Sequence, residues 1–179
     1  MISREKYLNQ IKDFIDKPVI KVITGMRRCG KSVILQQIKE LLLCQGIDGT
    51  QIFYVNFESL KYENLKDYRS LYQAVTDAVR KSDGRLYILL DEVQEVEGWE
   101  KAVNSFRVDF DCDIYITGSN ARLLAGDLAT LLSGRYVEIH IYPLSFNEYL
   151  AFAESNEEEK SLSIQENFAN YLRYGGLPG

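Results

Sequence analysis

Short, continuously apolar runs alternate along the chain with longer segments in which apolar residues recur every three or four positions. The short runs are typical of strands covered on both faces, and the longer segments are typical of amphipathic helices. The pattern predicts strands at residues 19–24, 51–57, 86–90, 113–117 and 136–141. It predicts helices at residues 7–15, 34–42, 68–79 and 99–110. We therefore expect an α/β fold, in which a parallel, doubly wound sheet lies between two helical layers and binds ligands at the carboxyl ends of its strands.

The pattern changes after Pro143, where no further strand is predicted. Two helical segments follow, at 146–153 and 164–172, with an acidic connector at 154–160 between them. We expect residues 1–143 to form the α/β core with its N-terminal helix. Residues 144–179 are interpreted as the start of a helical lid that is truncated, because the chain stops directly after a helix.

Composition narrows the classes of function. With 179 residues, of which 46% are hydrophobic, the chain has material for one α/β core and a small appendage. The formal net charge of −5 gives no overall attraction to nucleic acid or an anionic membrane. No apolar stretch approaches a membrane span and the charged start is unlike a signal peptide, so we expect a cytoplasmic protein. The single histidine, His140, leaves almost no material for histidine-based metal sites and histidine-centred triads, and the three cysteines are interpreted as free thiols.

Residues 25–32 read Gly-Met-Arg-Arg-Cys-Gly-Lys-Ser, which fits the phosphate-binding pattern G-x-x-x-x-G-K-[ST], the Walker A motif. The segment lies between a predicted strand and a predicted helix, as this motif requires. Glycines let the backbone curl until its N–H groups point at phosphate oxygens, while Lys31 would reach the β- and γ-phosphates and Ser32 would bind Mg²⁺. The predicted nucleotide-binding residues are Gly25, Met26, Arg27, Arg28, Cys29, Gly30, Lys31, Ser32 and Val33.

Two carboxylates follow the third predicted strand directly, as in a Walker B motif. Asp91 would hold Mg²⁺ through water, and Glu92 would orient and polarise the attacking water as a catalytic residue. This pair favours hydrolysis of a nucleoside triphosphate. Gln94 and Glu95 are weaker candidates and are interpreted as surface residues.

Polar residues also end the fourth predicted strand. Ser119 or Asn120 could hydrogen-bond the γ-phosphate or the attacking water, but the same residues are common in turns, and both interpretations stay open. Arg135 precedes the fifth strand, where it could neutralise transition-state charge, most simply across a subunit boundary. The alternative for Arg135 is an ordinary surface arginine.

Five segments together resemble the AAA+ superfamily, and more narrowly the prokaryotic ATPases whose phosphate loop carries paired arginines before Gly-Lys-Ser/Thr. They are the phosphate loop, Leu-Leu-Asp-Glu-Val-Gln at 89–94, Thr-Gly-Ser-Asn at 117–120, Ser-Gly-Arg at 133–135 and Pro-Leu-Ser-Phe-Asn-Glu-Tyr at 143–149. The resemblance implies strand order 5-1-4-3-2, adenine as the base, a sensor-1 role near Ser119 and Asn120, and an arginine-finger role for Arg135. It also implies a helical lid after Pro143 and further C-terminal segments.

The sequence thus predicts an ATPase that binds ATP and Mg²⁺ and acts on an unidentified protein or nucleic-acid effector. A homo-oligomer is expected if Arg135 acts across an interface. One alternative is a nucleotide-dependent switch or scaffold that turns over slowly. The other is a small-molecule kinase, which shares the phosphate loop but is not expected to carry the Asp91-Glu92 pair.

Overall fold

Five parallel strands form one sheet in this computed structural model, which describes residues 4–119, 128–155 and 162–177. The strands are β1 (Ile20–Gly25), β2 (Ile52–Asn56), β3 (Leu86–Asp91), β4 (Cys112–Thr117) and β5 (Tyr136–Ile141). Their order across the sheet is β2-β3-β4-β1-β5, and every neighbouring pair is parallel. This is the predicted order 5-1-4-3-2 read from the other edge, so the predicted fold class is confirmed.

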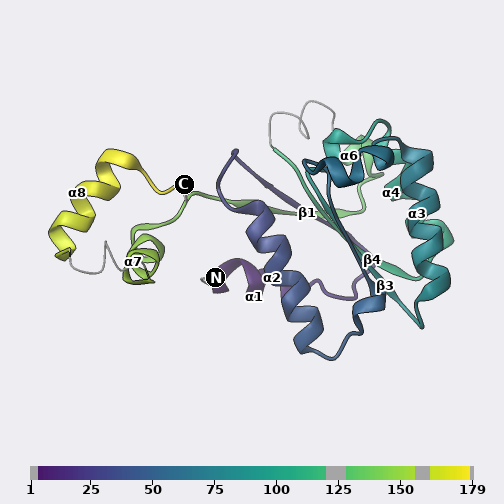
Figure 1. Cartoon of the computed structure of the whole chain (residues 1–179), viewed down its shortest axis with the longest axis horizontal. Coiled ribbons are helices and arrows are strands. Elements are labelled where there is room, and N and C mark those ends of the chain that lie inside the picture. Colours follow the sequence, from purple (N-terminus) through teal and green to yellow (C-terminus); the bar gives the residue numbers. More distant parts are fainter. Residues whose placement is uncertain (1–3, 120–127, 156–161, 178–179) are drawn as a thin grey trace.

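Helices cover both faces of the sheet and complete the three layers (Figure 1). One face packs against α1 (Glu5–Lys12) and α2 (Lys31–Cys44), and the other packs against α3 (Tyr68–Lys81), α4 (Trp99–Asp109) and α6 (Leu128–Leu131). Short 3₁₀ turns lie in the connections, at η1 (Gly49–Gln51), η2 (Leu60–Leu65) and η3 (Val93–Glu95). The α1 helix ends at Lys12, three residues before the predicted end, and turns carry the chain to β1.

Two apolar cores lie on opposite faces of the sheet because successive strand residues point in opposite directions. In β3, Ile88 and Leu90 join the core under α3 and α4, whereas Tyr87 and Leu89 join the core under α1 and α2. All six residues of β3 are buried. The continuous apolar run therefore reflects a central strand with both faces covered.

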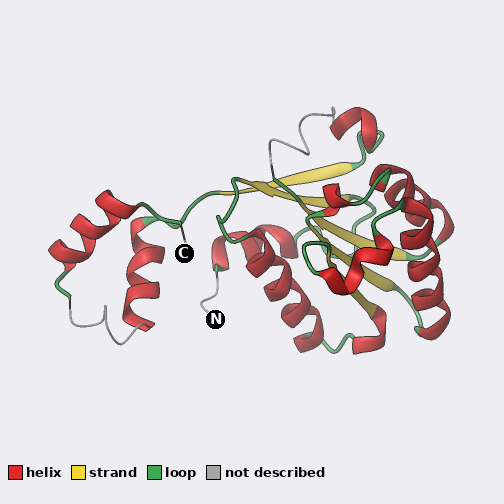
Figure 2. Cartoon of the chain, turned by 45° about the horizontal axis from the view of Figure 1, so that its top comes forward, coloured by secondary structure: helices red, strands yellow, loops and turns green. Residues whose placement is uncertain are grey.

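A helical unit of α7 (Phe146–Ser155) and α8 (Ile164–Tyr174) lies beyond the three layers (Figure 2). Two hydrogen bonds connect this unit to the segment that follows β5. The Leu144 N–H donates to the carbonyl of Gly176 at 2.6 Å, and the Tyr171 hydroxyl donates to the carbonyl of Leu144 at 2.8 Å. Helices therefore lie at both places predicted after Pro143. The domain division and the assignment of this unit as a lid stay predictions. No helix within the described residues is long and apolar enough to cross a membrane.

Candidate functional site

The loop between β1 and α2 curls tightly against the end of β5. Gly25 has φ +154°, and a Cβ there would lie 2.5 Å from the carbonyl oxygen of Ile141 and 2.7 Å from Cys29 Sγ, so only glycine fits. Gly30 has φ +98° and stands at the start of α2 without a side-chain cap. The first N–H groups of α2 therefore have no partner within the helix, and together with the helix dipole they are suited to bind an anion.

The remaining loop residues differ in exposure. Met26, Arg27 and Arg28 are exposed, and Arg28 adopts a left-handed conformation with φ 65°. Cys29 is buried, and burial raises the pKa of its thiol. Val33 is half-buried in the first turn of α2. The exposed arginines add positive charge around the loop, whereas Cys29 faces the protein interior.

Lys31 is only 4% exposed and lies beside Glu92. Its ammonium nitrogen Nζ is 3.4 Å from Glu92 Oε1 and donates to the carbonyl of Met26 at 3.3 Å. The structure thus brings together two residues that the sequence separates by sixty-one positions and that were predicted to serve one site. Their pairing places the Lys31 ammonium and the Glu92 carboxylate side by side, next to the phosphate loop.

Asp91 ends β3 fully buried among polar groups. The Thr117 hydroxyl donates to Asp91 Oδ1 at 2.5 Å, and the Asn56 amide donates to Asp91 Oδ2 at 3.0 Å. Burial raises the pKa of the Asp91 carboxyl, while hydrogen bonds from the Thr117 and Ser32 hydroxyls oppose the rise. Asp91 and Ser32, the two predicted metal ligands, are therefore in contact. Sequence reasoning missed Asn56, whose only signal is its position at the end of a strand.

Glu92 leaves the strand in a left-handed conformation, with φ 56° and ψ 51°. Its N–H donates to the Thr117 hydroxyl oxygen at 2.9 Å, so Thr117 contacts both consecutive acids. The Gln94 amide donates to Glu92 Oε2, and the other amide atom, Gln94 Oε1, is buried without a partner among the described residues. Gln94, interpreted above as a surface residue, is thus half-buried and in contact with Glu92.

A hollow of about 130 Å³ lies next to Glu92. It is lined by Arg27, Glu58, Glu92, Gln94, Glu95 and Ser119. Ser119 thus shares this hollow with Glu92, and its sensor role stays a prediction; Asn120, the other predicted sensor residue, lies outside the described residues. The hollow is small and its lining is polar, with three glutamates and one arginine, which suits water better than an apolar ligand.

Arg135 stands at the opposite edge of the sheet. It is exposed and precedes β5, whose first residue pairs with Ile20 of β1 and whose last residue pairs with Gly25. The six residues of β5 therefore separate Arg135 from the level of the loop, a distance of about 20 Å at roughly 3.3 Å per residue. The structure does not bring Arg135 to the site of its own chain.

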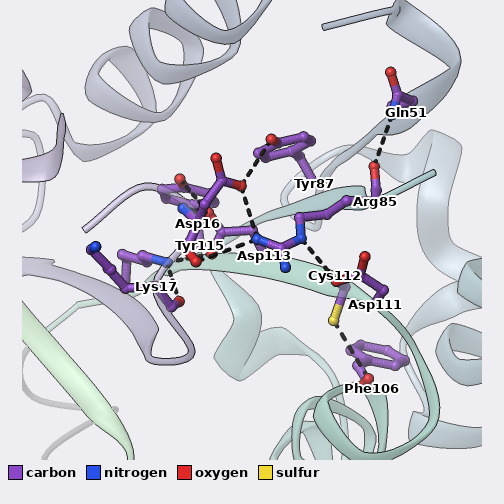
Figure 3. A network of polar contacts seen from close by, with 11 residues as sticks. Asp16, Lys17, Gln51, Arg85, Tyr87, Phe106, Asp111, Cys112, Asp113 and Tyr115 are labelled. Carbon is purple, nitrogen blue, oxygen red and sulfur yellow. Dashed lines mark hydrogen bonds and ion pairs between the residues drawn. The ribbon is translucent and has the colours of Figure 1, made fainter. Parts of the chain in front are cut away.

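A second polar network, which the sequence did not reveal, surrounds Asp113 at the amino ends of β1, β3 and β4 (Figure 3). Asp113 accepts from the buried Lys21 ammonium, from the Tyr115 hydroxyl at 2.8 Å and from the Asp16 N–H at 2.9 Å. Arg85 pairs with Asp16 at 3.0 Å and with Asp111 at 2.8 Å. These charges satisfy one another, so we interpret the network as structural.

Within the described residues, no group of three or more His, Cys, Asp or Glu side chains is placed to hold a metal ion. A cation bound at the carboxyl ends of the strands, here called the carboxyl edge of the sheet, would therefore be coordinated by Asp91, Ser32, water and oxygens of a bound ligand.

Comparisons with known proteins identify a family model and relatives of this chain. A family model described as "AAA domain" matches residues 17–150. An uncharacterized protein of Haemophilus influenzae is 51% identical over 178 residues, which are 99% of this chain and 44% of that protein. An uncharacterized protein of Methanocaldococcus jannaschii is 31% identical over 165 residues, 89% of this chain and 35% of that protein. The chain thus spans less than half the length of these relatives.

Solved structures share the fold at low sequence identity. Cdc6p from Pyrobaculum aerophilum superposes with a TM-score of 0.57 and 15% identity, covering 83% of this chain and 48% of that chain. The ORC1 protein of Aeropyrum pernix, solved with DNA, gives 0.58 and 15% over 89% of this chain and 50% of that one. Hsp104 of S. cerevisiae, solved with casein, gives 0.64 and 14% over 99% and 35%.

Proposed function

The chain belongs to the AAA domain family, and from this premise we propose that it binds Mg·ATP and hydrolyses the bond between the β- and γ-phosphates. The observation that carries the proposal is the meeting of Lys31, Ser32, Asp91 and Glu92 at one edge of the sheet. A phosphate-binding loop alone would fit any nucleotide-binding protein. The adjacent carboxylates add the chemistry that hydrolysis needs.

The residues present fit a magnesium ion. Mg²⁺ prefers oxygen ligands and keeps several waters, so it is commonly held by one or two protein groups together with phosphate oxygens. Asp91 is a buried carboxylate with one oxygen near the Ser32 hydroxyl, and no other carboxylate is needed. When bound, the ion would neutralise charge on the phosphates. The raised pKa of Asp91 supports the fit, because a buried carboxylate gains from a nearby positive charge.

Lys31 has two competing partners in this proposal. In the structure its ammonium pairs with Glu92 at 3.4 Å, and triphosphate would offer it a more highly charged anion. Binding would then move Lys31 from Glu92 to the phosphates. Glu92 is left with its carboxylate free to accept a hydrogen bond from water, so phosphate binding itself prepares the catalytic residue.

Glu92 would orient the water that attacks the γ-phosphorus and accept its proton. The left-handed backbone at Glu92 turns its side chain out of the strand direction, and Gln94 holds one carboxylate oxygen through its amide N–H. The orphaned Gln94 Oε1 could then accept a hydrogen bond from the same water. Ser119, which lines the hollow, would contact the γ-phosphate in this proposal.

A larger hollow of about 690 Å³ could hold the nucleoside. It lies between the start of α1 and the helical unit, and Arg4, Tyr7, Tyr142, Pro143, Glu148 and Tyr171 contribute to its lining. Arg4 connects it to the phosphate loop, because its guanidinium donates to the carbonyl of Cys29 at 3.0 Å. We propose that the base and ribose lie here, with residues 144–179 closing over them as a lid.

The distance of Arg135 from its own site favours one alternative, a switch that binds nucleotide tightly and turns over slowly as a single subunit. Under the main proposal, a second copy of the chain supplies Arg135 across an interface and accelerates hydrolysis. Both proposals predict binding, but only assembly raises the rate. Turnover per subunit, measured against protein concentration, separates them.

The effector is left open between a protein and a nucleic acid. The similar fold was solved with DNA in one case and with casein in another, so the fold is compatible with either kind of partner. The net charge of −5 gives no general attraction to nucleic acid, and a DNA effector would need a local basic surface.

Lys31→Ala tests the proposed function directly. We expect calorimetry to show loss of most Mg·ATP binding, because the variant removes the loop side chain that would pair with the β- and γ-phosphates. The matched control is Lys81→Ala, which removes an exposed lysine at the end of α3. If Lys31→Ala binds ATP as tightly as the control, the assignment of the phosphate loop is wrong.

A further inference from the structure

Arg4 connects three parts of the chain that are distant in sequence. Its Nη1 donates to the carbonyl of Cys29 at 3.0 Å, and its Nη2 donates to the carbonyl of Tyr142 at 3.0 Å. Its Nε and Nη2 donate to the two carboxylate oxygens of Glu148 at 2.8 and 3.2 Å. Arg4 thus contacts the phosphate loop, the end of β5 and the first turn of α7 at once.

These contacts belong to a buried side chain, because Arg4 is only 3% exposed. A buried guanidinium is costly unless its donors are paired, and here the paired donors point to fixed acceptors. The Arg4 guanidinium also lies over the Tyr7 ring, 4.6 Å from its centroid, and the Tyr7 hydroxyl accepts from the Tyr142 N–H at 3.1 Å. A lysine could not replace Arg4 here, because its single ammonium group lacks the planar set of N–H donors with which the guanidinium reaches all of these acceptors.

The Cys29 carbonyl matters because of the peptide to which it belongs. A trans peptide is planar, so the C=O of Cys29 and the N–H of Gly30 point in opposite directions. An arginine that holds the oxygen on one side therefore fixes the N–H on the other. Gly30 immediately precedes Lys31 and has φ +98°. Because glycine adopts positive and negative φ about equally well, its own conformational preference does not fix the orientation of the peptide between Cys29 and Gly30. Without Arg4, the orientation of this N–H would be held less firmly.

Glu148, in the first turn of α7, connects Arg4 to the helical unit. Its Oε2 accepts from the N–H and the hydroxyl of Ser145, at 2.8 and 2.9 Å, and the Glu148 N–H donates to Ser145 Oγ at 3.3 Å. This is a capping box at the start of α7. Burial alone would raise the pKa of Glu148, but hydrogen bonds from Arg4 and Ser145 outweigh it and lower the pKa. One charged carboxylate therefore both caps α7 and pairs with Arg4.

We propose that Arg4 is a positioning residue that holds the peptide between Cys29 and Gly30 in the phosphate-binding orientation and couples that orientation to α7. The inference rests on the proposed function and deepens it, because it makes the placement of the helical unit respond to phosphate in the loop. Arg4 need not touch the nucleotide for this role. Its effect passes through the carbonyl of Cys29 on one side and through Glu148 on the other.

The test uses two probes on the same set of variants. Mg²⁺ with inorganic tripolyphosphate reports on the loop alone, and its affinity is measured by calorimetry. Spin labels on the exposed Cys44 and on a cysteine replacing the exposed Gln165 report the distance between α2 and α8, with and without Mg²⁺ and a non-hydrolysable ATP analogue. The parent chain is expected to bind both probes and to change its label distance when the analogue binds.

Arg4→Ala should weaken tripolyphosphate binding about tenfold or more, which is the factor expected when one charge-assisted hydrogen bond is lost. The variant should also lose the change in label distance at saturating analogue. Glu148→Gln keeps an oxygen for the cap but removes the charge that pairs with Arg4, so it should lose the distance change while weakening tripolyphosphate less than Arg4→Ala. Arg85→Ala, which removes an arginine that pairs with Asp16 and Asp111 at the amino ends of the strands, is the matched control and should keep both responses.

Arg4→Ala with the parent's tripolyphosphate affinity, or Glu148→Gln with the parent's distance change, would overturn the inference. Circular dichroism first confirms that each variant is folded, and if Arg4→Ala is not, the Glu148→Gln result decides. Failure of the proposed function looks different, because then the parent chain itself binds neither ATP nor tripolyphosphate.

Discussion

Glu92→Gln separates the two tasks that the structure gives to one side chain. Glutamine keeps the size of glutamate and can turn its oxygen toward the Gln94 amide, which now donates to Glu92 Oε2. The substitution removes the negative charge beside Lys31 and the ability to accept a proton from water. We therefore expect opposite changes in binding and in turnover.

The binding change follows from the Lys31–Glu92 pair. Lys31 Nζ and Glu92 Oε1 lie 3.4 Å apart, and the two side chains are 3% and 14% exposed. The pair is therefore largely shielded from water. A pair of this kind contributes about 1–2 kcal/mol, between the values for exposed pairs and fully buried ones. Triphosphate no longer has to displace Glu92 from Lys31 in the variant. ATP affinity should therefore rise by roughly 5- to 30-fold.

The rate change is larger and has the other sign. Loss of a group that positions and deprotonates water lowers the rate by a factor on the order of 10² or more. Calorimetry with a non-hydrolysable analogue gives the affinity, and phosphate release under single-turnover conditions gives the rate. Wild-type turnover in Glu92→Gln would refute the catalytic role of Glu92. Unchanged or weaker affinity would refute the competition between Glu92 and phosphate for Lys31.

Three further predictions concern residues around this pair. Asp91→Asn should abolish Mg²⁺-dependent ATP binding, because an amide carries no charge with which to hold the ion. Because burial raises the pKa of Asp91, the parent should gain stability as the pH falls through that pKa, and Asp91→Asn should lack this gain; an equal pH dependence of the two thermal midpoints contradicts the argument. Gln94→Leu should lower kcat while changing ATP affinity less than about twofold; equal kcat values would return Gln94 to the surface role. Arg135→Ala and Glu92→Gln, each slow alone, should recover activity when mixed, because one interface then joins an intact Glu92 to an intact Arg135; mixed oligomers without recovered activity contradict a finger acting in trans.

The sequence was sufficient to predict the elements that local patterns govern. Apolar runs identified all five strands, and the spacing of loop, strand and acids predicted that Lys31, Asp91 and Glu92 would lie together. These predictions succeed because strand alternation and the loop motif are short-range signals and because parallel strands bring their carboxyl ends to one edge. The strand order came from the resemblance and not from the pattern.

Contacts between distant residues left no such signal. Arg4 and Glu148 are separated by 144 positions, and a single arginine ahead of an amphipathic helix resembles any solvated residue. The Ser145-x-x-Glu148 box could have been found as a helix start, but its sharing with Arg4 could not. Lys21 within an apolar strand was a visible anomaly, yet its partner Asp113 lies 92 positions away, and only the fold shows that the two meet.

The two polar clusters at opposite edges of the sheet show which kind of irregularity points to function. Left-handed residues occur at both edges, Glu92 at one and Asp16 at the other, so backbone strain does not distinguish them. The Asp113 network satisfies its own charges and has no buried unpaired side-chain atom among the described residues. The carboxyl edge, by contrast, combines the uncapped start of α2 with the orphaned oxygen of Gln94. A buried polar atom without a partner costs free energy, and the Gln94 oxygen lies on the residue that holds Glu92, next to Lys31; this is the physical reason to propose that the chemistry occurs there.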